Sequence, residues 1–188
     1  MKAGAGKSKG NGYEREVAKK LSLLFTQGQE EYAIWRTDSS GAASTTLHRK
    51  GKQTSFIQSQ AADLRQVCDK GIFPVLDRFC ELFMIETKFY ADCQLWPPWK
   101  ADLGQKLDQV ISDRSKVSKH IFFILKLNRK GEFVFTDSEI PFLPKYMTLY
   151  YYSDVFNMYL LKDLLEKPSP VTVGELNAIS KIQAIQPR

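Results

Sequence analysis

The feature that most constrains the fold is a run of apolar residues at 82–85 that ends directly in the tripeptide Glu86-Thr87-Lys88. A run without polar alternation is typical of a central strand that is buried on both faces of a sheet. Successive side chains of a strand alternate between faces, so we expect Glu86 and Lys88 to project together and Thr87 to point away. Charged side chains are seldom buried unless they are paired or functional, so two opposite charges at the end of a buried strand indicate a candidate site.

Asp63 supplies a second carboxylate, on a strand expected over residues 61–67. Phosphodiester hydrolysis needs a divalent cation that neutralises charge and a group that positions or deprotonates a water molecule. Asp63 and Glu86 could supply the oxygen ligands that Mg²⁺ prefers, and Lys88 could hold the water. Taken alone, an E-x-K triplet is more often a pair of solvated charges. Asp77 competes with Asp63 but ranks lower, because it lies in a polar stretch expected to be a connection.

Composition favours one basic domain. A chain of 188 residues with 43% hydrophobic residues can bury one ordinary core. The net charge of +6 and the pI near 9.1 favour an anionic partner such as nucleic acid. No apolar stretch approaches the ~20 residues needed to cross a bilayer, and residues 1–12 lack the apolar part of a signal peptide. We therefore expect a cytoplasmic protein without a membrane partner.

Cysteine and histidine are too few and too scattered for several other site classes. The three cysteines, Cys68, Cys80 and Cys93, have no C-x-x-C spacing, and the two histidines, His48 and His120, lie far apart. This spacing argues against disulfide bonds and against a zinc site. It also weakens any histidine-based nuclease chemistry.

Periodicity and turn residues divide the chain into three expected parts. These are a flexible basic arm over residues 1–12, a compact domain over 13–152 and a helical extension over 153–188. Helices are expected over residues 13–25, 103–117, 154–166 and 172–185, and further strands over 32–36, 120–127, 132–136 and 146–152. Asn11 is a plausible cap of the first helix, and Thr172 with Glu175 has the spacing of a capping box.

Two segments offer further contacts to nucleic acid. The polar stretch over residues 37–60 contains His48, Arg49, Lys50 and Lys52, a basic patch suited to phosphates, although an ordinary solvated loop is about equally expected. The pair Trp96 and Trp99 could stack on bases of an opened strand, but such residues more often pack in a core or an interface.

The order of these motifs resembles that of the PD-(D/E)xK nuclease superfamily. Within it, the chain is similar to Holliday junction resolvases of archaeal type and to related phage-encoded nucleases. The resemblance covers roughly residues 10–136 and rests on a helix with Glu14 and Arg15, a strand with Arg36, the turn Ser39-Ser40-Gly41, Asp63, and Glu86-Thr87-Lys88. The chain departs from the pattern at Ala62, where the family has proline before the aspartate.

The resemblance implies a restriction-endonuclease-like α/β core, a mixed central β-sheet flanked by helices, with extra C-terminal helices. It implies the catalytic set Glu14, Asp63, Glu86 and Lys88, in which the three carboxylates bind the metal and Lys88 orients the water. Arg36 and Ser40 would approach the scissile or an adjacent phosphate. The implied nucleic-acid contacts are Arg15, Arg36, Ser39, Ser40, His48, Arg49, Lys50 and Lys52.

The leading hypothesis is a Mg²⁺-dependent DNA endonuclease, with Mn²⁺ as a substitute ion, that acts on branched DNA, above all four-way junctions. Because such a junction offers two symmetric strands to cut, we expect a two-fold homodimer. One alternative is a nuclease of the same superfamily with a restriction or end-processing task. The other is a DNA-binding or assembly module that does not cut.

Overall fold

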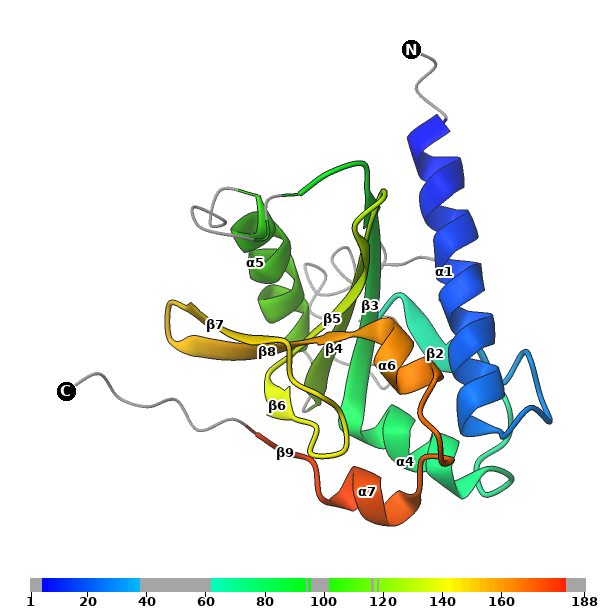
Figure 1. The fold of residues 1–188 in the computed structure, drawn as a ribbon. Helices are drawn as coiled ribbons and strands as arrows, with labels where there is room; N and C mark the ends of the chain where they lie inside the picture. Colours follow the sequence, from blue (N-terminus) through cyan, green and yellow to red (C-terminus); the bar gives the residue numbers. More distant parts are fainter. Residues whose placement is uncertain are drawn as a thin grey trace, which may run out of the picture.

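The fold is built on one mixed sheet. The computed structural model describes residues 5–37, 62–93, 95, 102–115, 117 and 119–181. Seven strands form the sheet in the order β1-β2-β3-β4-β5-β8-β7 (Figure 1). Their bounds are β1 (Ile34–Arg36), β2 (Leu64–Gln66), β3 (Phe83–Tyr90), β4 (His120–Leu127), β5 (Gly131–Thr136), β7 (Met147–Tyr151) and β8 (Asp154–Leu160). Of these strand pairs only β3 and β4 run parallel.

Helices cover both faces of this sheet. A parallel pair needs a crossover, and α5 (Leu103–Arg114) lies in the connection from β3 to β4. The opposite face is packed against α1 (Ala5–Phe25), α4 (Pro74–Leu82), α6 (Leu161–Leu165) and α7 (Val173–Asn177). Two short strands, β6 (Ser138–Glu139) and β9 (Ser180–Lys181), pair separately near the described C-terminal end. The expected α/β architecture with a mixed sheet between helices is therefore confirmed.

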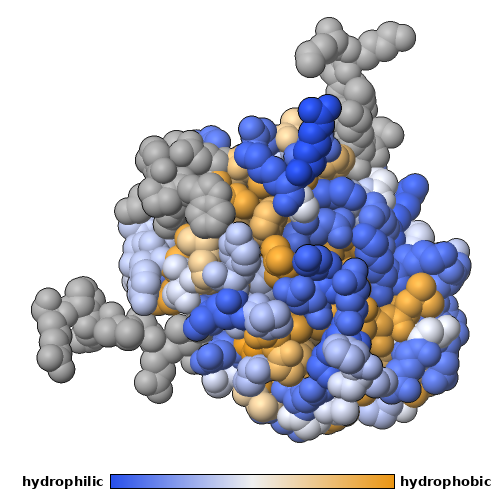
Figure 2. Space-filling model, viewed as in Figure 1, coloured by the Kyte–Doolittle hydropathy of each residue, from blue (hydrophilic) through white to orange (hydrophobic). Residues whose placement is uncertain are grey.

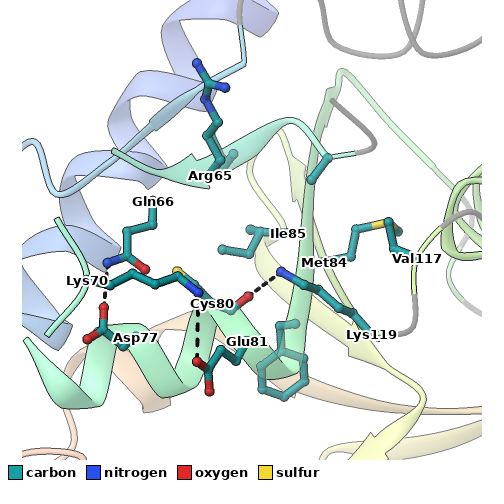
Figure 3. A pocket seen from close by; sticks show the side chains of 13 residues that line it. Arg65, Gln66, Lys70, Asp77, Cys80, Glu81, Met84, Ile85, Val117 and Lys119 are labelled. Carbon is teal, nitrogen blue, oxygen red and sulfur yellow. Dashed lines mark hydrogen bonds and ion pairs between the residues drawn. The ribbon is translucent and has the colours of Figure 1, made fainter. Parts of the chain in front are cut away.

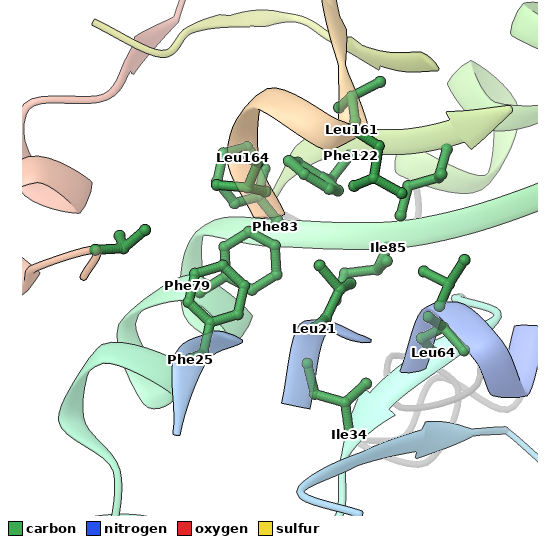
Figure 4. Close-up of a cluster of buried hydrophobic side chains, with 14 of the residues drawn as sticks. Leu21, Phe25, Ile34, Leu64, Phe79, Phe83, Ile85, Phe122, Leu161 and Leu164 are labelled. Carbon is green, nitrogen blue, oxygen red and sulfur yellow. The ribbon is translucent and has the colours of Figure 1, made fainter. Parts of the chain in front are cut away.

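Burial on both faces of the sheet explains why residues 121–125 of β4 are all apolar. Phe122 and Ile124 belong to the core on the α1 side, whereas Phe123 and Leu125 belong to the core on the α5 side. Figure 4 shows the α1-side core, in which side chains from α1, α4, β3 and α6 meet. The rings of Phe25 and Phe79 stack there with centroids 4.1 Å apart.

The helix expected over residues 154–166 is wrong for most of its length. Residues 154–160 form strand β8 between β5 and β7, and only a short helix, α6, follows. Residues 155–159 are all buried, so β8 lacks the alternation of a half-exposed strand. A short run buried on both faces cannot be distinguished from a buried helix by periodicity.

Three smaller expectations also change. The stretch around Asp77, expected to be a connection, is helix α4, which begins at Pro74. Helix α1 begins at Ala5, inside the segment expected to be a flexible arm, so Asn11 lies within the helix and does not cap it. The helix expected over 172–185 ends at Asn177, although its capping box of Thr172 and Glu175 is confirmed.

The surface shows no large separation of polar and apolar residues on the face viewed in Figure 2. Hydrophilic residues dominate along helix α1, and apolar residues are exposed in separate patches. Within the described ranges, no helix has both the length and the apolar character required to cross a membrane.

Candidate active site

The carboxylates and the lysine predicted from the sequence meet where β2 approaches β3. The antiparallel pairing of Leu64 with Ile85 brings the start of β2 beside the middle of β3. The backbone N–H of Asp63 donates to the carbonyl oxygen of Ile85 at 3.1 Å. Because Asp63 and Glu86 flank this strand pair on the same side, their side chains converge although they are far apart in sequence. We call Asp63, Glu86 and Lys88 the carboxylate–lysine cluster.

Lys88 lies between the two carboxylates. Its Nζ is 2.6 Å from Oε1 of Glu86 and 2.9 Å from Oδ2 of Asp63. Backbone groups also bind both carboxylates: the N–H of Thr87 donates to the same Oδ2 of Asp63 at 3.0 Å, and the N–H of Asp63 donates to Oε2, the second oxygen of Glu86, at 3.2 Å. The predicted shared face of Glu86 and Lys88 is confirmed, and both carboxylates are held in defined orientations.

Burial makes the electrostatics of this cluster strong. Asp63 is 3% exposed and Glu86 is 4% exposed. Burial, together with the neighbouring charge of Asp63, raises the pKa of Glu86 to about 8, against the opposing effect of Lys88. Burial disfavours the charged form of Lys88, but Glu86 and Asp63 outweigh it and hold the pKa of the lysine above its usual range. Lys88 is therefore a hydrogen-bond donor at neutral pH and not a base.

The donor set fits a hard divalent cation. Two buried carboxylates face one ammonium, so full ionisation leaves the cluster negative. Mg²⁺ is commonly bound through one or two carboxylates, with waters and substrate phosphate completing its shell. No group of three or more His, Cys, Asp or Glu residues capable of holding a metal occurs among the residues that the structure describes. The two carboxylates of the cluster are thus the described residues that could hold a divalent cation.

Glu14 and Arg36 form a separate ion pair. Oε2 of Glu14 lies 2.6 Å from Nε of Arg36, and Nη2 of Arg36 donates to Oδ1 of Asn11 at 2.9 Å. Arg36 follows the buried Ile34 by two positions, so it lies on the α1 side of β1. The structure does not group Glu14 with the two cluster carboxylates, and its expected contact with the metal stays a prediction. Arg15 is exposed on α1.

Asp77, the competing carboxylate, has a structural role. It accepts hydrogen bonds from Nε2 of Gln66 at 2.6 Å and from the N–H of Gly71 at 2.7 Å. These contacts tie helix α4 to the end of β2. The structure thus places Asp63, and not Asp77, beside Glu86, and the catalytic role of Asp63 stays a prediction.

Several predicted nucleic-acid contacts lie outside the described residues: Ser39, Ser40, His48, Arg49, Lys50, Lys52, Trp96 and Trp99. Arg65, which was not among the predicted site residues, lies on β2 two positions after Asp63. In an extended backbone this spacing places both side chains on one face.

Comparison with known proteins gives one family. A family model described as "Phage putative PDDEXK endonuclease" matches residues 5–184, which is nearly the whole chain. No curated protein and no solved structure shows significant similarity to the chain. The mixed sheet flanked by helices is consistent with the restriction-endonuclease-like fold of such nucleases. The chain belongs to this phage endonuclease family, and through it to the PD-(D/E)xK nuclease superfamily.

Proposed function

We propose that the protein is a Mg²⁺-dependent DNA endonuclease that cuts preferentially at four-way junctions, in the cytoplasm and as a homodimer. The observation that carries the nuclease part is the position of Lys88 between the two buried carboxylates. The basic net charge supports an anionic polymer as substrate. The family match supports a nuclease of the superfamily, and the choice of metal and of DNA form is our proposal.

Asp63 and Glu86 would hold the metal ion. When bound, Mg²⁺ supplies charge neutralisation at the scissile phosphate and lowers the pKa of a coordinated water. The two backbone N–H groups that bind these carboxylates keep their orientation fixed. Burial excludes bulk water from both side chains and strengthens their attraction for a cation.

Lys88 would orient the attacking water. Its raised pKa keeps it protonated, so its ammonium donates a hydrogen bond to the water oxygen and holds that oxygen in line with the phosphorus. The water oxygen then forms a bond to phosphorus while the bond to the leaving sugar oxygen breaks. Because a protonated lysine cannot accept a proton, the proton of the attacking water passes to solvent, and the leaving sugar oxygen takes up a proton from solvent.

Replacing Lys88 with Ala tests this assignment. We expect DNA binding to persist, measured by fluorescence anisotropy with Ca²⁺ in place of Mg²⁺, while the cleavage rate falls by about 10²–10³-fold, as for loss of one preorganised catalytic donor. Lys130→Ala is the matched control, since Lys130 is half-exposed and pairs with Asp92 away from the cluster. Cleavage at the wild-type rate by the Lys88 variant would refute the role.

Substrate choice is tested with four-way junctions, flaps, linear duplexes and single strands of matched sequence. Preferential cutting of the junction by a species that sediments as a dimer is the expected result. Equal rates on all forms would point instead to restriction or end processing. Salt-sensitive binding without cleavage under Mg²⁺ or Mn²⁺ would point to a module that does not cut.

A further inference from the structure

A cleft of about 460 Å³ lies beside the carboxylate–lysine cluster, between β2, β3 and α4 (Figure 3). In the described register, β2 pairs with β3 through Leu64 and Ile85, and the strands separate beyond this pair. Asp63 and Glu86 flank the pair on one side, and Arg65 flanks it on the other. The cleft therefore begins within one or two residues of the proposed metal ligands.

Three basic residues line this cleft: Arg65 of β2, Lys70 in the turn after β2, and Lys119 just before β4. Figure 3 shows Lys70 and Lys119 extending into it from opposite sides, and Arg65 extending from β2 away from helix α4. Nζ of Lys119 donates to the carbonyl oxygen of Cys80 at 2.5 Å, which leaves further N–H donors on the same ammonium. Apolar side chains of β3 and Val117 complete the wall.

Two carboxylates also line the cleft, but each has its own partners. Asp77 is bound by Gln66 and by the N–H of Gly71, as described above. Glu81 lies on helix α4, 4.0 Å from Nζ of Lys70 and 3.7 Å from Nη1 of Arg78. The three cations lining the cleft thus outnumber the two carboxylates, which favours an anionic occupant.

Arg65 is the strongest single indication of a ligand. Its Nε is buried and has no hydrogen-bond partner among the described residues. An unsatisfied buried donor is costly, and a guanidinium next to a phosphate forms paired, charge-assisted hydrogen bonds. Two residues along a strand span ~7 Å, so Arg65 lies about that far from Asp63 along the chain. This places it within reach of a phosphate neighbouring one bound at the cluster.

We propose that the cleft is a subsite for one nucleotide of the DNA strand being cut, the nucleotide between the first and second phosphates beyond the scissile phosphate. Arg65 binds the first of these two phosphates, and Lys119 with Lys70 binds the second. The cleft volume falls in the ~300–1,000 Å³ range of small-molecule sites, which suits one nucleotide. The inference rests on the proposed nuclease function and adds where the strand runs beyond the metal site.

The test combines variants with neutralised phosphates. Binding of DNA is measured with Ca²⁺ in place of Mg²⁺, using oligonucleotides in which one phosphate near the cut is replaced by an uncharged methylphosphonate. The variants are Arg65→Ala, Arg65→Lys and Lys119→Glu. Lys145→Glu is the control, because Lys145 is exposed and does not line the cleft.

In the wild type, two adjacent methylphosphonate positions should each weaken binding by about 10- to 100-fold, the range for a charge-assisted contact. Arg65→Ala should bind unmodified DNA more weakly than the wild type by the same factor. A methylphosphonate at the phosphate assigned to Arg65 should weaken its binding no further. Lys119→Glu should likewise be insensitive to a methylphosphonate at the phosphate assigned to Lys119. Lys145→Glu should bind like the wild type and respond to both methylphosphonates. Such non-additivity identifies the contacting pair.

The proposal would be overturned if a methylphosphonate weakened DNA binding equally in the wild type and in Arg65→Ala. Coupling to Arg65 without coupling to Lys119 would also overturn it, because the strand would then bypass the cleft. Arg65→Lys keeps the positive charge but lacks the paired N–H donors of the guanidinium, so we expect DNA binding between that of the wild type and that of Arg65→Ala. This variant also serves if Arg65→Ala folds poorly. Cleavage by the wild-type protein under Mg²⁺ is scored separately, so that failure of the subsite is distinct from failure of the nuclease function.

Discussion

Replacing Glu86 with Gln should remove a pH dependence of stability from the metal-free protein. Burial and the charge of Asp63 raise the pKa of Glu86 to about 8 in the folded state, from an ordinary value of 4.5. The unfolded chain therefore releases this proton first as the pH rises. The stability contributed by the neutral carboxyl is fully present below about pH 4.5 and is lost as the pH rises through about 8.

The structure sets the size of this effect. At about 1.4 kcal/mol per pKa unit, the shift corresponds to a few kcal/mol of unfolding free energy between pH 5 and pH 8. Glu86 is almost fully buried, so solvent screening does not reduce the effect greatly. Such a change is a large fraction of the stability of an ordinary domain.

Urea denaturation in EDTA at several pH values between about 5 and 8.5 measures this pH dependence of the free energy of unfolding. The wild type should lose a few kcal/mol relative to Glu86→Gln over this range, while Glu139→Gln, an exposed glutamate in β6, should follow the wild type. Parallel curves for the wild type and Glu86→Gln would refute the reasoning. That result would mean that the carboxyl is ionised in the folded state at low pH.

Three further predictions concern the core, the second ion pair and the metal. Phe79→Ala should cost about 3–5 kcal/mol in chemical denaturation, because Phe79 is 2% exposed and stacks on Phe25; a loss below about 1 kcal/mol would contradict its central role. A double-mutant cycle of Glu14→Gln and Arg36→Ala should give a coupling of about 1 kcal/mol in the same assay, and additive losses would show that the contact contributes nothing. Mg²⁺ at about 100 times its Kd should stabilise the wild type by about 2.7 kcal/mol in thermal unfolding, and an equal gain in Glu86→Gln would remove Glu86 from the ligand set.

Local physics explains which parts of the fold could be predicted from the sequence. The buried strand that carries Glu86, the apolar strand β4 and the helix ending at Phe25 follow from patterns within single elements. The shared face of Glu86 and Lys88 follows from alternation on one strand. The strands expected over residues 120–127 and 132–136 leave only a short connection between them. Gly131, at the start of β5, adopts a positive φ of 111° that other residues rarely tolerate.

Elements buried on both sides were harder to predict. Strand β8 was expected to be helical because its apolar residues face both layers, and the neighbours that decide its state are distant in sequence. Helix α4 was missed because the turn before it and its mixed composition resembled a connection. Tertiary packing overrides weak local preference in both cases.

The sequence by itself determined the chemistry available at the end of β3: a carboxylate and an ammonium on one face of a buried strand. Only the tertiary structure decided which other groups join them. Pairing of β2 with β3 places Asp63, and not Asp77, beside Glu86 and opens the cleft beside Arg65 where the strands part. Packing of α1 against β1 places Glu14 with Arg36. Local dihedral preferences fix the direction of a side chain, whereas the approach of two strands depends on burial of the whole core.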